Sequence, residues 1–189
     1  LAARRNVGFL TGDVSGRRAN LRAMRSMDLL CPSESELRES YGSFDKSLPT
    51  LVWNLLEETH SKAAAITMGP EGLVAFDRLS GADTMAQDSF ASRLRAEHVP
   101  ALAPFAIDPL GCGDSLIAAA TLALSCGGSL LAATRLGSAA AAIQAQRIGN
   151  IPISATDLRQ TLVRIQTAHM TFAPAEVVSA RSSAALRAS

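Results

Sequence analysis

Short apolar runs alternate with longer helical segments along most of this chain, and this alternation limits the folds open to it. The apolar runs expected to form buried strands are residues 6–11, 28–31, 63–68 and 73–76. Helical patterning is present at residues 17–27, 33–41, 48–60, 116–126, 130–146 and 154–166. Such alternation predicts an α/β fold, in which helices cover both faces of a mostly parallel sheet. Ligands of such sheets bind beyond the carboxyl ends of the strands.

Two parts of the chain are harder to interpret. Residues 78–97 are polar with weak periodicity, so we expect a surface excursion there. Residues 98–107 hold apolar clusters broken by prolines, which indicates an edge strand and its approach. We expect residues 1–166 to form one folded part, followed by a loosely ordered Ala-, Ser- and Arg-rich tail at 167–189.

Composition argues against several classes of protein. The 189 residues are 48% hydrophobic, which suffices for one domain with a buried core and argues against a disordered chain. Acidic and basic residues are intermixed and the formal net charge is +1, so no nucleic-acid partner is expected. No apolar run approaches the length of a membrane span, so no membrane partner is expected either. Cys31, Cys112 and Cys126 are widely spaced, which favours neither a zinc site nor a disulfide framework and indicates a cytoplasmic protein.

The segment from Asp108 to Asp114 carries the clearest chemical signal, because a glycine-containing loop runs directly into a small-residue helix. Gly111 and Gly113 let the backbone bend so that several amide N–H groups converge at the helix start. That arrangement is an anion hole, suited to a transferring phosphoryl group. Asp114 could accept a proton there from an attacking hydroxyl. In the structural alternative, the glycines permit a tight turn and Asp114 only caps the helix.

This segment resembles the D-T-x-G-A-G-D signature of the ribokinase/PfkB carbohydrate kinase family, with Pro109 in place of threonine and Cys112 in place of alanine. Three other segments match family motifs in order and spacing. They are residues 29–37 (the P-N-x-x-E segment), 66–72 (the T-x-G-x-x-G nucleotide turn) and 138–149 (the late helix and its loop). The resemblance, over roughly residues 6–162, implies a Rossmann-like (ribokinase-like) fold whose N-terminal strands and lid are absent.

The resemblance also implies an activity, the ATP-dependent transfer of a phosphoryl group to a hydroxyl of a sugar or sugar phosphate. Asp114 would be the general base of this reaction. The anion hole would be made by the backbone amides of Gly111, Cys112 and Gly113. The residues implied along the nucleotide are Thr67, Gly69, Gly72 and Ser138, of which Gly72 preserves the turn and Ser138 lies beside the adenine.

Two metal ions follow from the same resemblance. A monovalent cation such as K⁺ would order the anion-hole loop, surrounded by Asp108 and the carbonyls of Leu110, Gln144, Arg147 and Gly149.

Glu36 resembles the family's glutamate, which acts through water on the Mg²⁺–phosphate region. Ser33 stands where the family has asparagine. The same S-x-x-E pattern is also a capping box at the start of a helix, and both interpretations stay open.

Two classes of function therefore remain. The first is a carbohydrate kinase, and the second is a truncated, non-catalytic nucleotide-binding remnant or regulatory module with the same fold. The sugar-binding part would come from a missing N-terminal portion, and a homodimer is possible because the family's lid often mediates dimers. A dinucleotide-binding domain is disfavoured, because no G-x-G-x-x-G motif follows an expected strand.

Overall fold

Five strands form one sheet within the residues that the computed structural model describes, which are 6–14, 20–79, 94–103 and 105–172, with side chains described as far as 167. The chain divides into two units, Leu1–Ile153 and Ser154–Ser189, and the sheet lies in the first. The strands follow chain order across the sheet. They are β1 (Thr11–Gly12), β2 (Leu29–Leu30), β3 (Ala63–Thr67), β4 (Leu73–Arg78) and β5 (Leu94–Val99).

Four of these five strands run in the same direction. β1 pairs with β2 and β2 with β3 in parallel, whereas β3–β4 and β4–β5 are antiparallel. Only β4 is therefore reversed, and it returns from β3 through a short turn that contains Gly69 and Gly72. The expected mostly parallel sheet is confirmed, and this hairpin is its one exception among the described strands.

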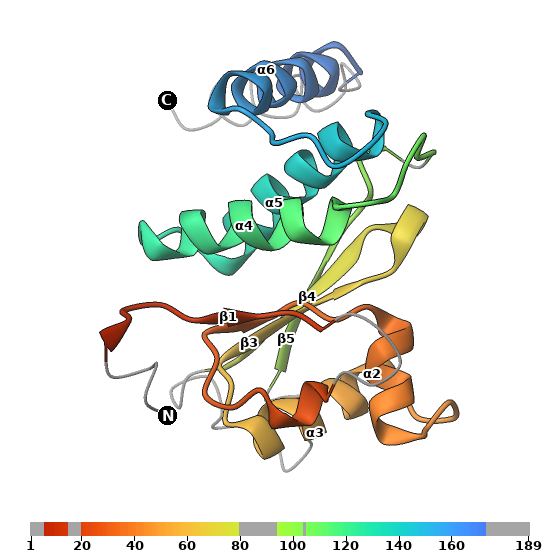
Figure 1. Ribbon diagram of the computed structural model, residues 1–189, viewed down its shortest axis with the longest axis vertical. Helices are drawn as coiled ribbons and strands as arrows, with labels where there is room; N and C mark the ends of the chain where they lie inside the picture. The colour runs from red at the N-terminus through yellow and green to blue at the C-terminus, as the bar shows by residue number, and fades with distance from the viewer. Residues whose placement is uncertain (1–5, 15–19, 80–93, 104, 173–189) are drawn as a thin grey trace, which may run out of the picture. The chain divides into compact units, whose positions relative to one another are not determined.

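Helices cover both faces of the sheet (Figure 1). On one face lie the short 3₁₀ helix η1 (Leu21–Ala23) and helices α2 (Glu34–Tyr41) and α3 (Leu48–Thr59). On the other lie α4 (Cys112–Ser125) and α5 (Leu130–Ala145). Both faces are buried, which explains why residues 29–31 and 63–66 are apolar without alternating polar residues.

Successive strand residues supply the two halves of the core. Leu30 and Ile66 pack with the leucines of α3, whereas Leu29 and Ala65 pack with α4 and α5. This division follows from the two-residue period of a strand, which sends neighbouring side chains to opposite faces. The core residues with no exposed surface include Leu51, Leu55, Leu56, Ala64 and Ala120.

Small residues let α4 and α5 lie close together. A Cβ added at Gly137 would lie 2.8 Å from the Leu116 carbonyl oxygen, so no larger residue fits there without a shift. Ala133, Ala139 and Ala140 are buried along the same helix. The small residues of α5 thus allow close helix packing.

The structure corrects several of the sequence-based expectations. Of the strand expected at residues 6–11, only Thr11 lies in a strand, β1 (Thr11–Gly12). Residues 78–97 include most of β5 (Leu94–Val99), which lies at the sheet edge and begins before the edge strand expected at 98–107. Arg95 stands opposite Asp77 in the β4–β5 register and forms an ion pair with it, which explains the polar pattern. The helix expected at 17–27 is reduced, among described residues, to the single turn η1 (Leu21–Ala23).

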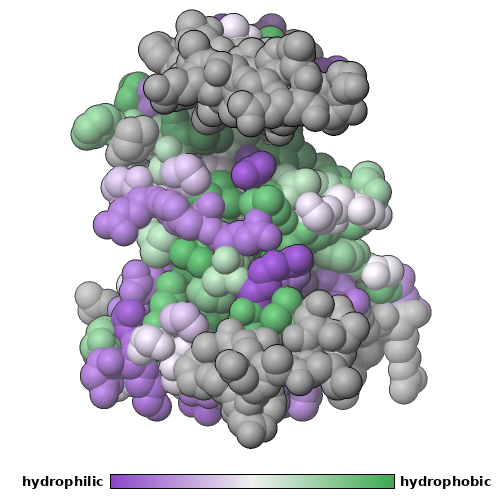
Figure 2. Space-filling view, turned by 180° about the vertical axis from the view of Figure 1, so that it is seen from behind, coloured by the Kyte–Doolittle hydropathy of each residue, from purple (hydrophilic) through white to green (hydrophobic). Residues whose placement is uncertain are grey.

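Hydrophobic residues also reach the surface of the first unit. Phe105, Ile107, Leu110 and Ile148 are all exposed. Figure 2 shows hydrophobic and hydrophilic residues interspersed on the visible face, in agreement with the intermixed charges of the sequence. No described helix is both long and apolar enough to cross a membrane.

The second unit contains α6 (Ala155–Phe172). Ser154 and Asp157 form a capping box at its start, with the Asp157 amide donating to Ser154 Oγ at 3.1 Å and the Ser154 amide donating to Asp157 Oδ2 at 2.9 Å. The helix continues past residue 166, where the tail was expected to begin, and residues 173–189 lie outside the described part.

Candidate active site

The first turn of α4 is shaped by Gly111, which precedes the helix with a φ of 79°. Only glycine adopts this left-handed conformation readily, and a side chain here would also collide with Asn150. The Ser115 amide donates to the Gly111 carbonyl at 2.9 Å, which closes the first helical turn. The glycine expected to bend this loop is therefore required for two separate reasons.

The amides at this helix start are not equivalent. The Cys112 amide donates to the Pro109 carbonyl at 3.2 Å, so it serves the turn. The amides of Gly113 and Asp114 lie in the first turn, where α-helix geometry gives an N–H group no intrahelical acceptor. Of the three amides expected in the anion hole, that of Gly113 is thus better placed to receive an anion than that of Cys112.

Asp114 lies exposed in this first turn, where a negative charge interacts favourably with the helix dipole. It lines an open polar pocket of about 430 Å³ together with Asp13, Asp108, Gly111 and Gly113. The N-cap residue of α4 is Gly111, which has no side chain that could cap the helix. The interaction of the Asp114 charge with the helix dipole supports the alternative in which Asp114 serves only the helix start.

Asp13 is a member of this pocket that sequence reasoning did not select. It directly follows β1, at the carboxyl end of a parallel strand, which is the position that could have identified it. Burial, opposed by the hydrogen bond from the Val14 amide, raises its pKa to about 6, and the nearby charges of Glu36 and Asp114 add to the rise.

Glu36 forms the capping box that its sequence pattern permitted. Its carboxylate accepts from the Ser33 amide at 2.8 Å and from Ser33 Oγ at 2.7 Å, and its own amide donates to Ser33 Oγ. The charge of Glu36 nonetheless interacts with Asp13 and contributes to its raised pKa. No group of three or more His, Cys, Asp or Glu side chains in the described ranges is arranged to hold a metal ion. A bound Mg²⁺ would need phosphate oxygens and water to complete its shell.

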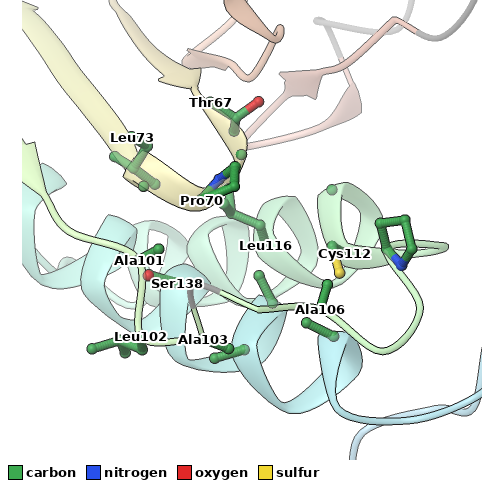
Figure 3. Close-up of a pocket in the computed structure, with 17 residues that line it drawn as sticks. Thr67, Pro70, Leu73, Ala101, Leu102, Ala103, Ala106, Cys112, Leu116 and Ser138 are labelled. Carbon is green, nitrogen blue, oxygen red and sulfur yellow. The ribbon is translucent and has the colours of Figure 1, made fainter.

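A second, mostly apolar pocket of about 330 Å³ lies beside the polar one (Figure 3). It brings together the four residues expected along the nucleotide, namely Thr67, Gly69, Gly72 and Ser138. Its other walls come from the start of α4, the loop after β5 and α5, and the walls from the β5 loop and α5 beyond Ser138 had no signal in the sequence. These include Leu102, Ala103, Ala106, Ala141 and Ala142.

Gly72 holds the turn between β3 and β4 against the chain that leaves β5. Its φ is 95°, and a Cβ here would overlap the Val99 carbonyl oxygen and the backbone of Pro100. The Met68 amide donates to the Gly72 carbonyl at 2.8 Å and closes the turn. Gly72 therefore allows the β3–β4 turn to lie close to the backbone of the chain that leaves β5.

The residues expected around a monovalent cation also meet, but hydrogen bonds join them. The Asp108 carboxylate accepts from the amides of Leu110, at 3.0 Å, and Gly149, at 2.9 Å, which lowers its pKa. Gln144 Nε2 donates to the carbonyls of Leu110, at 3.2 Å, and Gly149, at 2.7 Å. The Gln144 carbonyl accepts from the Arg147 amide at 3.0 Å. In this arrangement the carbonyls face an amide group, which does not fit a cation-binding cage.

Comparisons with known proteins identify a matching family and solved structures with a similar fold. The family model for pfkB family carbohydrate kinases matches residues 11–157. Among solved structures, ribokinase from Thermotoga maritima is 24% identical with a TM-score of 0.65, over 85% of this chain and 51% of that one. Phosphofructokinase-2 from Escherichia coli in complex with potassium is 19% identical with a TM-score of 0.65, over 87% and 50%. Arabidopsis thaliana ribokinase complexed with ribose and ATP is 22% identical with a TM-score of 0.63, over 80% and 46%.

The chain therefore belongs to the pfkB family of carbohydrate kinases, and its fold is ribokinase-like. It spans about half the length of the solved structures that it matches. No curated protein matches it.

Proposed function

We propose that this chain supplies the nucleotide-binding and catalytic part of an ATP-dependent kinase that phosphorylates a hydroxyl of a sugar or sugar phosphate. The observation that carries the proposal is the junction of the two pockets, because Pro109 and Gly113 line both. A nucleotide base in the apolar pocket would direct its phosphates to the first turn of α4. The reacting hydroxyl would then lie in the polar pocket, beside Asp114.

Asp114 acts in this proposal as the general base. Phosphoryl transfer needs positioning, charge neutralisation and a group that accepts the proton of the attacking hydroxyl. Asp114 offers an exposed carboxylate within one helical turn of the Gly113 amide. The backbone amides of Gly111, Cys112 and Gly113 would form the anion hole, although that of Cys112 must leave Pro109 to take part.

The apolar pocket is the proposed nucleotide site. Its walls are largely apolar or small, with Thr67 and Ser138 as hydroxyl-bearing exceptions, which suits a flat aromatic base. Gly69 and Gly72 bring the β3–β4 turn close to the ligand without side chains in the way.

Mg²⁺ is the proposed companion of ATP at the polar pocket. Asp13 and Glu36 offer carboxylates whose charges interact, and Mg²⁺ is commonly held by one or two carboxylates together with substrate phosphates. The capping hydrogen bonds of Glu36 restrict it to an indirect role through water. We assign no step to a monovalent cation, because Gln144 donates hydrogen bonds to carbonyls that would bind it. The residues implied around that cation are Asp108, Leu110, Gln144, Arg147 and Gly149.

The second candidate is a nucleotide-binding module without catalysis. The observation that favours it is the amide of Cys112, which donates to the Pro109 carbonyl at 3.2 Å and is therefore not free to bind a transferring phosphoryl group. The free thiols of Cys31, Cys112 and Cys126 agree with a cytoplasmic location.

Calorimetry separates a nucleotide-binding chain from one that only shares the fold. ATP with Mg²⁺ is titrated into the 189-residue chain, and its melting temperature is measured at the same ligand concentrations. Binding is expected to release or absorb heat and to raise the melting temperature by mass action. A folded chain that shows neither effect would contradict both candidates. Phosphorylation of a panel of sugars and sugar phosphates then distinguishes the kinase from the module.

A further inference from the structure

Two sets of hydrogen bonds, one accepted by a carboxylate and the other donated by a carboxamide, hold the loop before α4 to the turn after α5. Asp108 accepts from the amides of Leu110 and Gly149, and the side chain of Gln144 donates to the carbonyls of the same two residues. Leu110 and Gly149 are thus each held through both their N–H and their C=O groups. The loop that leads into Gly111 is fixed by one carboxylate and one carboxamide.

The orientation of the Gln144 carboxamide follows from its surroundings. One terminal atom lies 3.2 Å and 2.7 Å from two carbonyl oxygens, and only the nitrogen can donate to both. An oxygen in that place would be repelled by both carbonyls. The side chain has no exposed surface, and its Oε1 has no hydrogen-bond partner in the described part of the chain. The fold therefore tolerates an unsatisfied oxygen in order to place the NH₂ group between the carbonyls.

That NH₂ group stands where a cation would be coordinated. Alkali and alkaline-earth cations are bound in proteins by carboxylate and carbonyl oxygens, and here the carbonyls of Leu110 and Gly149 and the carboxylate of Asp108 are such ligands. The Gln144 carboxamide nitrogen presents two partly positive hydrogens to the carbonyl oxygens of Leu110 and Gly149 without a counter-ion. We infer that the Gln144 side-chain amide takes the place of a monovalent cation in this chain, so that the loop preceding α4 is ordered without K⁺.

Gln144 is, on this inference, a positioning residue. It contacts the Leu110 carbonyl, one residue before Gly111, and so acts on the first turn of α4 through the backbone. The inference concerns the order of the loop and does not rest on the proposed kinase activity. Its test can therefore fail while the proposed function stands, and the reverse also holds.

Melting of the wild-type chain tests the inference without any substitution. The melting temperature of the 189-residue chain is measured in KCl and in choline chloride at the same ionic strength, over a range of concentrations. The two salts are expected to give the same melting temperature throughout. A saturable rise that occurs with KCl alone would show that a cation is bound and would overturn the inference.

Two variants at one position test whether the amide fills the place of a cation. Gln144→Ala removes both hydrogen bonds and leaves space for an ion, whereas Gln144→Met fills a similar volume without a donor. Both are expected to melt below wild type, by roughly 2–8 °C. KCl, but not choline chloride, is expected to restore part of the loss in Gln144→Ala and none in Gln144→Met.

Other results of the variant experiment are also decisive. If both variants melt as wild type does, the amide does not hold the loop. If KCl restores nothing in Gln144→Ala, the amide does not occupy the place of a cation. Either result overturns the inference. If neither variant folds, the wild-type comparison decides alone.

Discussion

Gly113 lies against Asp13 where the first turn of α4 approaches the end of β1. A Cβ added at Gly113 would lie 3.6 Å from Asp13 Oδ2. The carboxylate of Asp13 is therefore close to the helix start at which the phosphoryl group is proposed to bind. The end of β1 therefore lies next to the loop before α4, which comes about a hundred residues later in the sequence.

Asp13→Asn is expected to raise the melting temperature at pH 8 and to change it little near pH 3, below the ordinary carboxyl pKa. The pKa of Asp13 is raised by burial to about 6. A raised carboxyl pKa contributes stability that is fully present below the ordinary value and is lost as the pH rises through about 6. Asparagine keeps the shape and removes the charge. Melting curves of the variant and of wild type at the two pH values, without Mg²⁺, measure the difference.

Asp45→Asn provides a control of opposite sign. Asp45 accepts a hydrogen bond from Ser43 Oγ at 3.0 Å, which lowers its pKa. Its contribution is present above the ordinary pKa, so the substitution should lower the melting temperature at pH 8. Equal effects of the two substitutions at pH 8 would contradict the assignment of Asp13 as a buried, unfavourably ionised group.

Gly72→Ala is expected to destabilise the chain strongly, because its Cβ would overlap the Val99 carbonyl oxygen at a φ of 95°. Gly69→Ala is the matched control, since its φ is also positive, at 57°, and nothing lies within 4 Å of the added Cβ. Backbone strain of this kind costs about 1–3 kcal/mol, and only Gly72→Ala adds a steric overlap. Chemical denaturation measures both losses. A loss in Gly69→Ala as large as in Gly72→Ala would contradict the close approach of the β3–β4 turn to the chain after β5.

Ala142→Phe is expected to weaken ATP binding at least about tenfold, because the ring would occupy the apolar pocket. Ala142 is partly buried and lines that pocket, so the variant is expected to fold. Ala118→Phe, at an exposed position on α4 outside the pocket, should leave binding unchanged. Calorimetric titration with ATP and Mg²⁺ gives the affinities. Unchanged affinity in Ala142→Phe would place the nucleotide elsewhere.

Much of this fold could be predicted from local sequence patterns. The apolar run at 63–68 became β3 nearly as expected, because a strand that is buried on both faces is apolar along most of its length. The amphipathic segment at 48–60 became α3, because a helix that is buried on one face has apolar residues at the helical period. The glycine loop before α4 and the Gly69–Gly72 turn were also identified, because glycine is the residue that adopts positive φ angles most readily.

The features that were missed depend on contacts between distant segments. β5 was hidden by polar residues such as Arg95, which pairs with Asp77 across an exposed edge. Asp13 carried no local signal of burial, since its environment comes from α2 and α4. Gln144 stands in an alanine-rich helix, and only the folded chain shows that its amide meets Leu110 and Gly149.

The substitution Asp114→Asn tests the central claim most directly, in whichever form of the protein phosphorylates a sugar acceptor, this chain or a longer one that includes it. Asparagine preserves the shape but cannot accept the proton of the attacking hydroxyl, and loss of a general base typically costs ~10²–10⁴-fold in rate. The backbone amides of α4 are unaffected, so ATP affinity should stay the same. Turnover, ATP affinity and melting temperature are measured on the same variant. We expect turnover to fall by that factor with affinity and melting temperature nearly unchanged, whereas full turnover with a loss of stability of about 1 kcal/mol would show that Asp114 serves only the helix start.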